Sequence, residues 1–426
     1  MKNPYDVLQE RGFVYQCTDE DALRQIFEQE RVTAYIGFDA TADSLHVGSL
    51  VPIMSLAWLQ RTGHRPIGLV GGGTTMVGDP SGKTEARQML SPADIRRNME
   101  GLKTQLSRYI RFGGDDAMMI DNGDWLLPLN YIEFLRDIGK YFSVNRMLAA
   151  ESYKMRLETG LTFIEFNYML LQAYDFLVLY QQHKNKLQMG GQDQWGNIVA
   201  GIDLIRRVEG EQAYGLTFPL LMDPRTGEKF GKTHSGAVWL DADKTSPYDF
   251  FQFWRNTDDG MVEKCLGLFT FLPIEEVRRL GSLEGSAINR AKEILAYEVT
   301  ALNHGHEEAA KAYLASIKAF GSADPDGRVE TSSKVAEVSL EITQDLPTTV
   351  LPASDLESGM NVADVFVAAG LAKSKGEARR LVRQGGAYVN DVRIDDEDHT
   401  FNPSDLKDDS LILRAGKKRY HRINFK

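Results

Sequence analysis

The fold of this chain is organised around Tyr35-Ile36-Gly37-Phe38-Asp39-Ala40-Thr41-Ala42-Asp43-Ser44-Leu45-His46-Val47-Gly48-Ser49. Its start belongs to a run of β-branched and aromatic residues, 32–38, which predicts a strand that breaks at Gly37. Its end precedes the apolar run 50–59, which predicts a helix capped by residues 43–44. A strand, a turn and a helix N-terminus together predict an anion site, because free backbone N–H groups and the helix dipole point the same way.

Short apolar segments alternate with helical segments along the first half of the chain. Besides those above, we expect the following strands: 66–71, 117–120 and 186–189. We expect further helices at 91–112, 162–182 and 193–208. This alternation predicts an α/β domain with a parallel, Rossmann-like sheet covered on both faces. In such sheets ligands bind outside the carboxyl ends of the strands, where this chain places Asp39, residues 71–73, Asn122 and residues 190–193.

The helix expected at 162–182 carries three polar residues on one narrow stripe. Tyr168, Gln172 and Asp175 stand at i, i+4 and i+7, within about 60° of arc at 100° per residue. Most residues around them are apolar, so the helix is expected to be buried. The stripe indicates either a polar pocket or a hydrogen-bonded network in the core. In a pocket, a phenol, an amide and a carboxylate would suit a small zwitterion with a hydroxyl of its own.

Two glycine-containing segments bear on phosphate binding. Residues 78–84 have three residues between their glycines, whereas a P-loop needs four, so a P-loop is disfavoured. No dinucleotide fingerprint follows residues 71–73, which disfavours a nicotinamide dehydrogenase. The other segment, 229–233, places Lys229 and Lys232 among glycines. It predicts either a mobile cationic loop or a solvated basic turn.

Composition indicates a soluble globular protein. The length of 426 residues predicts two or three domains, and 42% of the residues are hydrophobic while 26% are charged. The chain shows no signal-peptide pattern, and no apolar run approaches about 20 residues. A cytoplasmic location without membrane association is therefore expected. Cys17 and Cys265 stand far apart and predict no disulfide framework, as expected in a reducing compartment.

The second half of the chain differs in charge and in pattern from the first. Residues 247–320 read as helices, 321–352 as a polar linker with prolines, and 353–426 as helices followed by short strands. Residues 361–426 carry 13 Lys and Arg against 10 Asp and Glu, while residues 1–360 carry 36 against 50. A mildly basic end on a chain of net charge −11 indicates a local contact with RNA.

Taken together, these motifs resemble those of bacterial-type tyrosyl-tRNA synthetases, a family of class I aminoacyl-tRNA synthetases. Residues 46–49, His-Val-Gly-Ser, are similar to the first class I signature, His-Ile-Gly-His. Residues 229–233, Lys-Phe-Gly-Lys-Thr, are similar to the second, Lys-Met-Ser-Lys-Ser. Other strings match in order: 35–48, 78–83, 134–140, 171–176 and 193–197. Residues 371–386 and 388–390 resemble an RNA-binding domain named after a ribosomal small-subunit protein, so the resemblance covers essentially the whole chain.

The resemblance implies a role for each matching residue. The residues implied to bind tyrosine are Tyr35 and Asp175 at the phenol hydroxyl, Asp79, Tyr168 and Gln172 at the ammonium, and Gln188. The residues implied to bind ATP are Gly37, Asp39, Thr41, His46, Gly48, Gly191, Asp193, Gln194 and Lys232. The residues implied to act in catalysis are His46, Ser49, Lys83, Arg87, Lys229, Lys232 and Thr233.

The resemblance also implies the reaction and its partners. L-Tyrosine would react with ATP to give tyrosyl-adenylate and pyrophosphate, and tyrosine would then pass to the 3′-terminal ribose of tRNA(Tyr). Mg²⁺ would accompany ATP, held by phosphates and water, with no metal site of the protein and no tightly bound cofactor. A homodimer is implied, with residues 134–144 similar to the family's interface. The implied domains are a catalytic domain (1–220), a mobile loop region (221–246), a helical domain (247–320), a linker (321–352) and an RNA-binding domain (353–426).

Two departures and two alternatives remain at this point. Ser49 replaces the usual His or Asn, and Ile36 replaces a residue that is often Cys, both near the expected ATP ribose. A tryptophanyl-tRNA synthetase shares the core, but Asp175 beside Tyr35 argues against it, because an indole has one donor and no acceptor. A synthetase-like RNA-binding protein without activity is the other alternative, against which the catalytic residues above argue.

Overall fold

The computed structural model describes residues 2–81, 90–150, 153–154, 157, 160–233, 236–338, 348–390, 392–406, 410–416 and 419–426. The chain divides into two compact units, residues 1–309 and residues 310–426, each described by itself below. No helix in the described ranges is long and apolar enough to span a bilayer.

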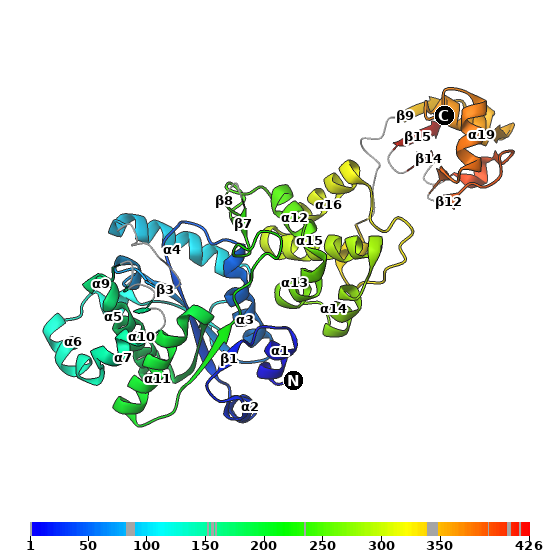
Figure 1. Ribbon diagram of the computed structural model, residues 1–426. Coiled ribbons are helices and arrows are strands. Elements are labelled where there is room, and N and C mark those ends of the chain that lie inside the picture. The colour runs from blue at the N-terminus through cyan, green and yellow to red at the C-terminus, as the bar shows by residue number, and fades with distance from the viewer. Residues whose placement is uncertain are drawn as a thin grey trace. The chain divides into compact units, whose positions relative to one another are not determined.

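The first unit begins as an α/β domain (Figure 1). Up to its third strand the elements are α1 (Pro4–Glu10), β1 (Gln16–Cys17), α2 (Glu20–Gln29), β2 (Thr33–Asp39), η1 (Val47–Ser49), α3 (Leu50–Arg61), β3 (Arg65–Gly71) and η2 (Thr74–Met76). There follow α4 (Pro92–Leu106), β4 (Met118–Asp121), α5 (Gly123–Leu126), α6 (Tyr131–Asp137), η3 (Gly139–Tyr141), α7 (Val144–Leu148), α9 (Phe163–Phe166) and α10 (Tyr168–His183). The domain closes with β5 (Asn185–Gly191), η4 (Gln192–Gln194), α11 (Trp195–Glu209) and β6 (Tyr214–Phe218).

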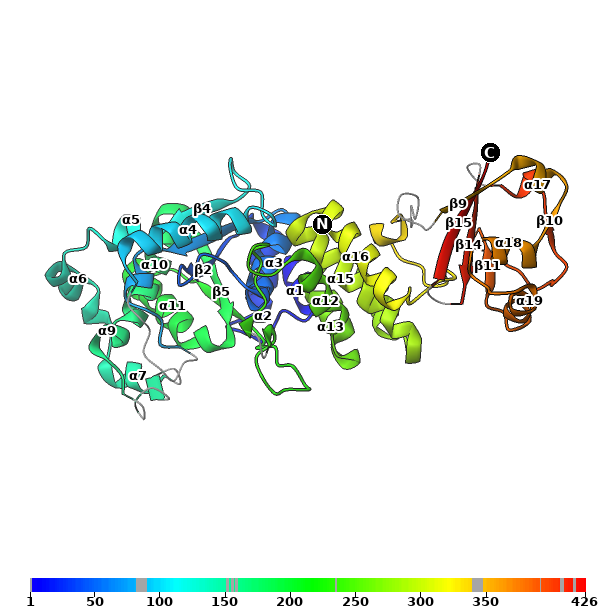
Figure 2. The same cartoon turned by 90° about the horizontal axis from the view of Figure 1, so that it is seen from above.

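These strands form one six-stranded sheet in the order β1-β6-β5-β2-β3-β4. All neighbours are parallel except β1 and β6, which pair antiparallel at one edge. Helices α3 and α4 pack on one face and α10 and α11 on the other (Figures 1 and 2). The predicted α/β fold with both faces covered is therefore confirmed, with the antiparallel edge as an addition. Strand order reverses between β2 and β5, which is where doubly wound sheets bind ligands.

Helix boundaries follow local capping where the sequence signal is strong. α4 begins as predicted, with Pro92 in its first turn and the Ser91 hydroxyl accepting the Asp94 N–H at 3.2 Å. The expected helix 162–182 begins with a capping box at Thr162 but is interrupted at Asn167, so that it forms α9 and α10. The stripe of three polar residues lies entirely on α10.

Two expectations for the opening stretch are wrong. The strand does not break at Gly37, because β2 pairs with β3 through to Asp39. The helix is not capped by residues 43–44. Instead the His46 side chain caps the short turn η1, and α3 begins only at Leu50. Residues 40–46 therefore form a longer turn than predicted between the strand and the helix.

The first unit continues with two short strands after the lysine loop and then with a helical part. Its elements are β7 (Lys232–Thr233), β8 (Gly236–Ala237), α12 (Pro247–Arg255), η5 (Asp259–Met261), α13 (Val262–Phe269), α14 (Ile274–Gly281), η6 (Gly285–Ala287), α15 (Ile288–His304) and the start of α16 (His306–Phe320). Buried aromatic residues, including Phe250, Trp254 and Phe269, form its core, where Phe230 also packs. The helices predicted over 247–320 are confirmed.

The second unit has a core of its own around Phe366, Leu411 and Ile423. Its elements after α16 are η7 (Lys334–Ala336), β9 (Thr348–Leu351), α17 (Ala353–Glu357), β10 (Met360–Asn361), α18 (Val362–Ala368), α19 (Lys375–Arg383), β11 (Ala387–Val389), β12 (Val392–Arg393), β13 (Thr400–Phe401), η8 (Pro403–Asp405), β14 (Ser410–Ala415) and β15 (Arg419–Phe425). Five strands form a sheet in the order β12-β11-β14-β15-β9. Strand β9 lies inside the range expected to be linker, yet it pairs in parallel with β15.

Candidate active site

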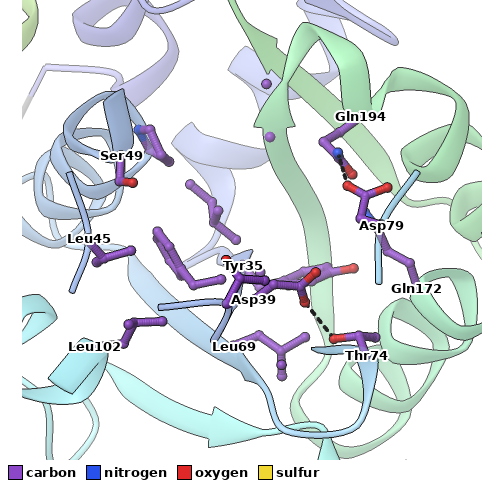
Figure 3. Close-up of a pocket in the computed structure, with 18 of the residues that line it drawn as sticks. Tyr35, Asp39, Leu45, Ser49, Leu69, Thr74, Asp79, Leu102, Gln172 and Gln194 are labelled. Atoms are coloured by element: carbon purple, nitrogen blue, oxygen red, sulfur yellow. Dashed lines mark hydrogen bonds between the residues drawn. The ribbon is translucent and has the colours of Figure 1, made fainter. Parts of the chain in front are cut away.

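A cavity of about 440 Å³ opens at the carboxyl ends of β2, β3 and β5. It lies where the strand order reverses, so the sheet topology alone places it at the expected ligand site. Figure 3 shows Leu45, Ser49 and Leu102 along one side and Asp79, Gln172 and Gln194 along the other. The side with Asp79, Gln172 and Gln194 is therefore polar, whereas Leu45 and Leu102 contribute apolar surface beside Ser49 on the other side.

Most of the predicted site residues meet in this cavity. Those that line it are Tyr35, Gly37, Asp39, Thr41, His46, Gly48, Ser49, Asp79, Tyr168, Gln172, Asp175, Gln188, Gly191, Asp193 and Gln194. Lys83 and Arg87 lie outside the described residues. Lys232 and Thr233 are described only as the backbone of β7. Lys229 is exposed and is not part of the lining.

Asp175 forms the polar floor of the cavity. Its carboxylate accepts one hydrogen bond from Asn122 Nδ2 at 2.9 Å and another from Trp125 Nε1 at 2.8 Å. Burial raises the pKa of Asp175 to about 8, and the two donated hydrogen bonds act in the opposite direction. Asn122 is fixed in turn, because its Oδ1 accepts the Gly73 N–H at 2.8 Å. The floor is therefore a rigid acceptor with both of its oxygens held.

Two buried polar atoms in the cavity have no partner among the described residues. They are the phenol oxygen of Tyr35 and Oε1 of Gln188. Tyr35 is 1% exposed and its ring packs against Phe176. Burial, with the nearby Asp175 charge, raises the pKa of Tyr35 well above its usual value, so its hydroxyl stays protonated. A buried hydroxyl without a partner is costly in a folded protein, which indicates that a ligand completes the site.

A second polar network lies on the opposite wall. Gln194 Nε2 donates to Asp79 Oδ2 at 2.7 Å, and Asn197 Nδ2 donates to Gln172 Oε1 at 2.9 Å. Burial raises the pKa of Asp79 to about 6, opposed by donors that include the Ser81 N–H. The carboxylate is ionised at neutral pH, and the lining residues that the structure describes include no Lys or Arg. It is suited to an ammonium group.

Asp39 ends β2 and joins the two walls. Its Oδ1 accepts from the Thr74 hydroxyl at 2.9 Å (Figure 3). Its Oδ2 accepts from the Tyr168 hydroxyl at 3.2 Å. Gly71 faces this pair closely, because an added Cβ would clash with the Asp39 carboxylate and the Thr74 hydroxyl. These contacts hold the Asp39 carboxylate at the carboxyl end of β2.

Backbone hydrogen bonds join the first signature segment and its neighbour Leu45 to residues 238–240, which follow the second signature segment. The Val47 N–H donates to Val238 at 2.9 Å, and the Leu240 N–H donates to Leu45 at 2.9 Å. Gly231, at φ +89°, has no room for a Cβ because Val47 packs against it. The segment after the lysine loop is therefore docked on the His46 turn.

The predicted anion site of free N–H groups at His46 needs correction. The Gly48 N–H donates to His46 Nδ1 at 3.0 Å, and the Ser49 N–H donates to the His46 carbonyl at 2.8 Å. Because His46 Nδ1 accepts a hydrogen bond, a neutral His46 carries its proton on Nε2. These two backbone N–H groups are therefore bonded within the turn and are not the free donors that the sequence predicted.

Sequence reasoning missed several residues of the site. Thr74, Leu102, Trp125 and Trp239 contact the cavity or its floor, and none was predicted. The rings of Trp239 and His46 pack edge to face, with centroids 6.2 Å apart. Asn122 was noted only as following a strand, without a role. Trp125 follows the same strand, β4, and its position beyond a carboxyl end is the one signal that could have found it.

Comparison with known proteins agrees with this geometry. The family model for class I tRNA synthetases of the tryptophan and tyrosine type matches residues 28–321, and that for the tyrosine–tRNA ligase SYY-like C-terminal domain matches residues 340–423. Tyrosine–tRNA ligase of Desulfatibacillum aliphaticivorans is 54% identical over 99% of this chain and 98% of that protein. That of Caldanaerobacter subterraneus is 52% identical over 98% of each chain. A C-terminally truncated mitochondrial tyrosyl-tRNA synthetase of Aspergillus nidulans has a TM-score of 0.68 at 32% identity, covering 75% of this chain and 95% of its own.

Proposed function

The chain belongs to the tyrosine–tRNA ligase family of class I aminoacyl-tRNA synthetases, and from this premise we propose how its cavity serves tyrosine, ATP and tRNA(Tyr). In this proposal the enzyme first joins L-tyrosine to AMP from ATP, and then transfers tyrosine to the 3′-terminal ribose of the tRNA.

The observation that carries the proposal is the pairing of Tyr35 with Asp175 at the floor. Tyr35 offers a buried hydroxyl without a partner among the described residues, and Asp175 offers a buried carboxyl group. A substrate phenol can donate to a carboxyl oxygen of Asp175 and accept from Tyr35 at the same time. Phenylalanine would leave both groups unsatisfied, and an indole cannot accept the hydrogen bond.

The other end of tyrosine has a matching wall. Asp79, ionised at neutral pH, would bind the α-ammonium with Gln172 and Tyr168. Asn197 holds Gln172 Oε1 in place, so the amide is already oriented. The α-carboxylate would then lie toward Asp193 and Gln194 and meet ATP. These assignments rest on the cavity lining and on the chemistry of the side chains.

In the first step the tyrosine carboxylate oxygen attacks the α-phosphorus of ATP. The new O–P bond forms as the bond between the α-phosphorus and the bridging oxygen breaks, and pyrophosphate leaves with both electrons. Negative charge gathers on the phosphates, where the His46 Nε2–H and the lysines of the second signature would stabilise it. The tRNA ribose hydroxyl then attacks the acyl carbon and AMP leaves.

Further parts of the proposal concern ions and partners. Mg²⁺ would accompany ATP, bound by phosphate oxygens and water.

A homodimer is supported by exposed apolar side chains concentrated in residues 127–164: Leu127, Tyr131, Ile132, Val144, Phe163 and Ile164. A cytoplasmic location remains a prediction from the sequence. On α19 of the second unit, Lys375 pairs with Asp364 and Arg383 pairs with Glu397, so these two cations support the proposed RNA contact less than their charges alone would.

Exchange of radiolabelled pyrophosphate into ATP, run with each of the twenty amino acids, tests the proposed function. We expect exchange with tyrosine alone, followed by charging of tRNA(Tyr). Exchange with tryptophan in place of tyrosine would establish the tryptophanyl alternative. Binding of tRNA without exchange for any amino acid would establish an inactive RNA-binding protein.

Changing Lys232 to alanine is expected to lower the rate of adenylate formation and to leave tyrosine affinity nearly unchanged. The lysine would meet pyrophosphate only as charge develops in the transition state, so its loss affects kcat more than substrate binding. Single-turnover adenylate formation and equilibrium binding of tyrosine without ATP separate the two effects. Weaker tyrosine binding by Lys232→Ala would contradict this role.

Changing Ser49 to asparagine is expected to alter the activation rate by no more than about tenfold, or about 1.4 kcal/mol, in either direction. Ser49 lines the cavity and its side chain makes no capping hydrogen bond to α3, so the substitution disturbs no helix cap. Pyrophosphate exchange at varied ATP concentration measures the change. Complete loss of activity would show that the serine hydroxyl itself is required.

A further inference from the structure

The turn at 40–45 is held by side chains that belong to other elements. Asn98 Nδ2 donates to the Ala40 carbonyl at 2.9 Å. Gln105 Oε1 accepts the Leu45 N–H at 2.8 Å, and Gln105 Nε2 donates to the Ser44 hydroxyl at 2.9 Å. Both ends of the Gln105 amide are therefore bonded to this turn, which lies between Asp39 and His46.

Helix α4 presents one face to the turn. Asn98, Gly101, Leu102 and Gln105 stand at i, i+3, i+4 and i+7, which is one side of a helix. Gly101 lies so close that an added Cβ would clash with the Asp43 carbonyl. Leu102 reaches past the turn and lines the cavity itself (Figure 3). The helix and the turn are therefore in direct contact over the length of this face.

The burial of these amides argues that they serve the turn. Asn98 and Gln105 are each 4% exposed. A buried amide is stable only when its donors and acceptors are paired, and these two pair with the turn that carries Thr41 and leads to His46. Loss of the Gln105 amide would leave the Leu45 N–H without its acceptor, and the turn would relax away from its position.

We propose that Gln105 is a positioning residue that holds the 40–45 turn in the geometry needed for ATP. The inference rests on the proposed function, because it takes the cavity beside this turn as the ATP site. Gln105 does not line the cavity, so its effect passes through Ser44 and Leu45, which do. The hydrogen bonds of Gln105 reach Ser44 and Leu45, whereas those of Asp175 reach Asn122 and Trp125. Tyrosine binding at Asp175 should therefore be independent of Gln105.

Gln105→Met tests the proposal, since methionine keeps the length and removes both hydrogen bonds. Gln60→Met is the matched control, because the Gln60 amide also holds backbone, donating to the Arg111 carbonyl at 2.8 Å and accepting its N–H at 3.0 Å. Gln60 lies outside the cavity lining. The full chain is used for the wild type and both variants.

We expect Gln105→Met to weaken binding of a non-hydrolysable ATP analogue, or to slow adenylate formation, by about tenfold or more, because displacing a reacting group by about 1 Å costs up to about 100-fold. Tyrosine affinity without ATP should stay within about twofold of the wild type, and Gln60→Met should match the wild type in both measurements. Ser44→Ala removes one of the two Gln105 hydrogen bonds, together with the bond that the Ser44 hydroxyl donates to the Leu45 carbonyl at 2.8 Å. It should shift ATP affinity in the same direction by less.

The outcomes separate this inference from the proposed function. If the wild type exchanges pyrophosphate with tyrosine but Gln105→Met matches Gln60→Met, the positioning role is overturned. Equal losses of tyrosine and ATP affinity would also overturn it, since that pattern indicates general damage. If the wild type fails to use tyrosine, the proposed function fails, and the ATP-analogue titration still decides the role of Gln105. Should Gln105→Met fail to fold, unchanged ATP affinity in Ser44→Ala overturns the inference.

Discussion

Replacing Asp175 with asparagine is expected to lower kcat/KM for tyrosine by about 100-fold, equal to about 2.7 kcal/mol. Both oxygens of the carboxylate accept a hydrogen bond, one from Asn122 and one from Trp125. An asparagine has only one oxygen, so its NH₂ group must face one of these donors. The buried site then contains two opposed donors, and the substrate phenol loses its acceptor. Pyrophosphate exchange at varied tyrosine concentration measures the loss.

Tyr35→Phe provides the matched control for this substitution. It removes one neutral hydroxyl that has no partner among the described residues, so it should cost less than about 1.5 kcal/mol. It should also weaken discrimination against phenylalanine, because one of the two groups that need a hydroxyl is gone. Activation by Asp175→Asn at the wild-type rate would show that the phenol binds elsewhere.

The polar stripe was predictable because it follows a single regular helix. On α10 the period of 3.6 residues places Tyr168, Gln172 and Asp175 on one side, and all three line the cavity. Of the two readings that the sequence left open, a pocket and a core network, the cavity supports the pocket. The alternation of strands and helices was predictable for the same reason, since each element carries its own periodicity.

The missed residues have in common that no local pattern marks them. Trp125, Thr74 and Trp239 reach the site from three separate segments, and their roles depend on tertiary contacts. Strand β1 has two residues, too few to show a period. The cap of η1 is a histidine, which is not among the usual capping residues, so the helix start was placed too early.

Removal of residues 339–426 is expected to leave tyrosine activation within about twofold of the wild type and to lower tRNA charging by about 100-fold or more. All residues that line the cavity lie between Tyr35 and Trp239, and the first unit has its own packed core. A cut at Ser354 would be a poor choice, because it would leave β9 in the chain without its partner strand β15. Thr349 of β9 bonds His421 at 2.9 Å, and the Lys426 N–H donates to Leu351 at 3.0 Å.

The salt dependence of tRNA charging gives a second test of RNA binding by the second unit. In the second unit, Arg414 stacks on Tyr388 with its guanidinium carbon 3.6 Å from the ring centre, and Arg419 donates to the Leu371 carbonyl at 3.0 Å. Such fixed cations suit contacts with RNA phosphates. Protein binding to RNA phosphates weakens steeply as the salt concentration rises. Charging by the full chain should therefore fall with salt much faster than pyrophosphate exchange, whose ligands are enclosed in the cavity. Charging by the truncated chain at the wild-type efficiency, with an unchanged salt slope, would show that the second unit does not bind the tRNA.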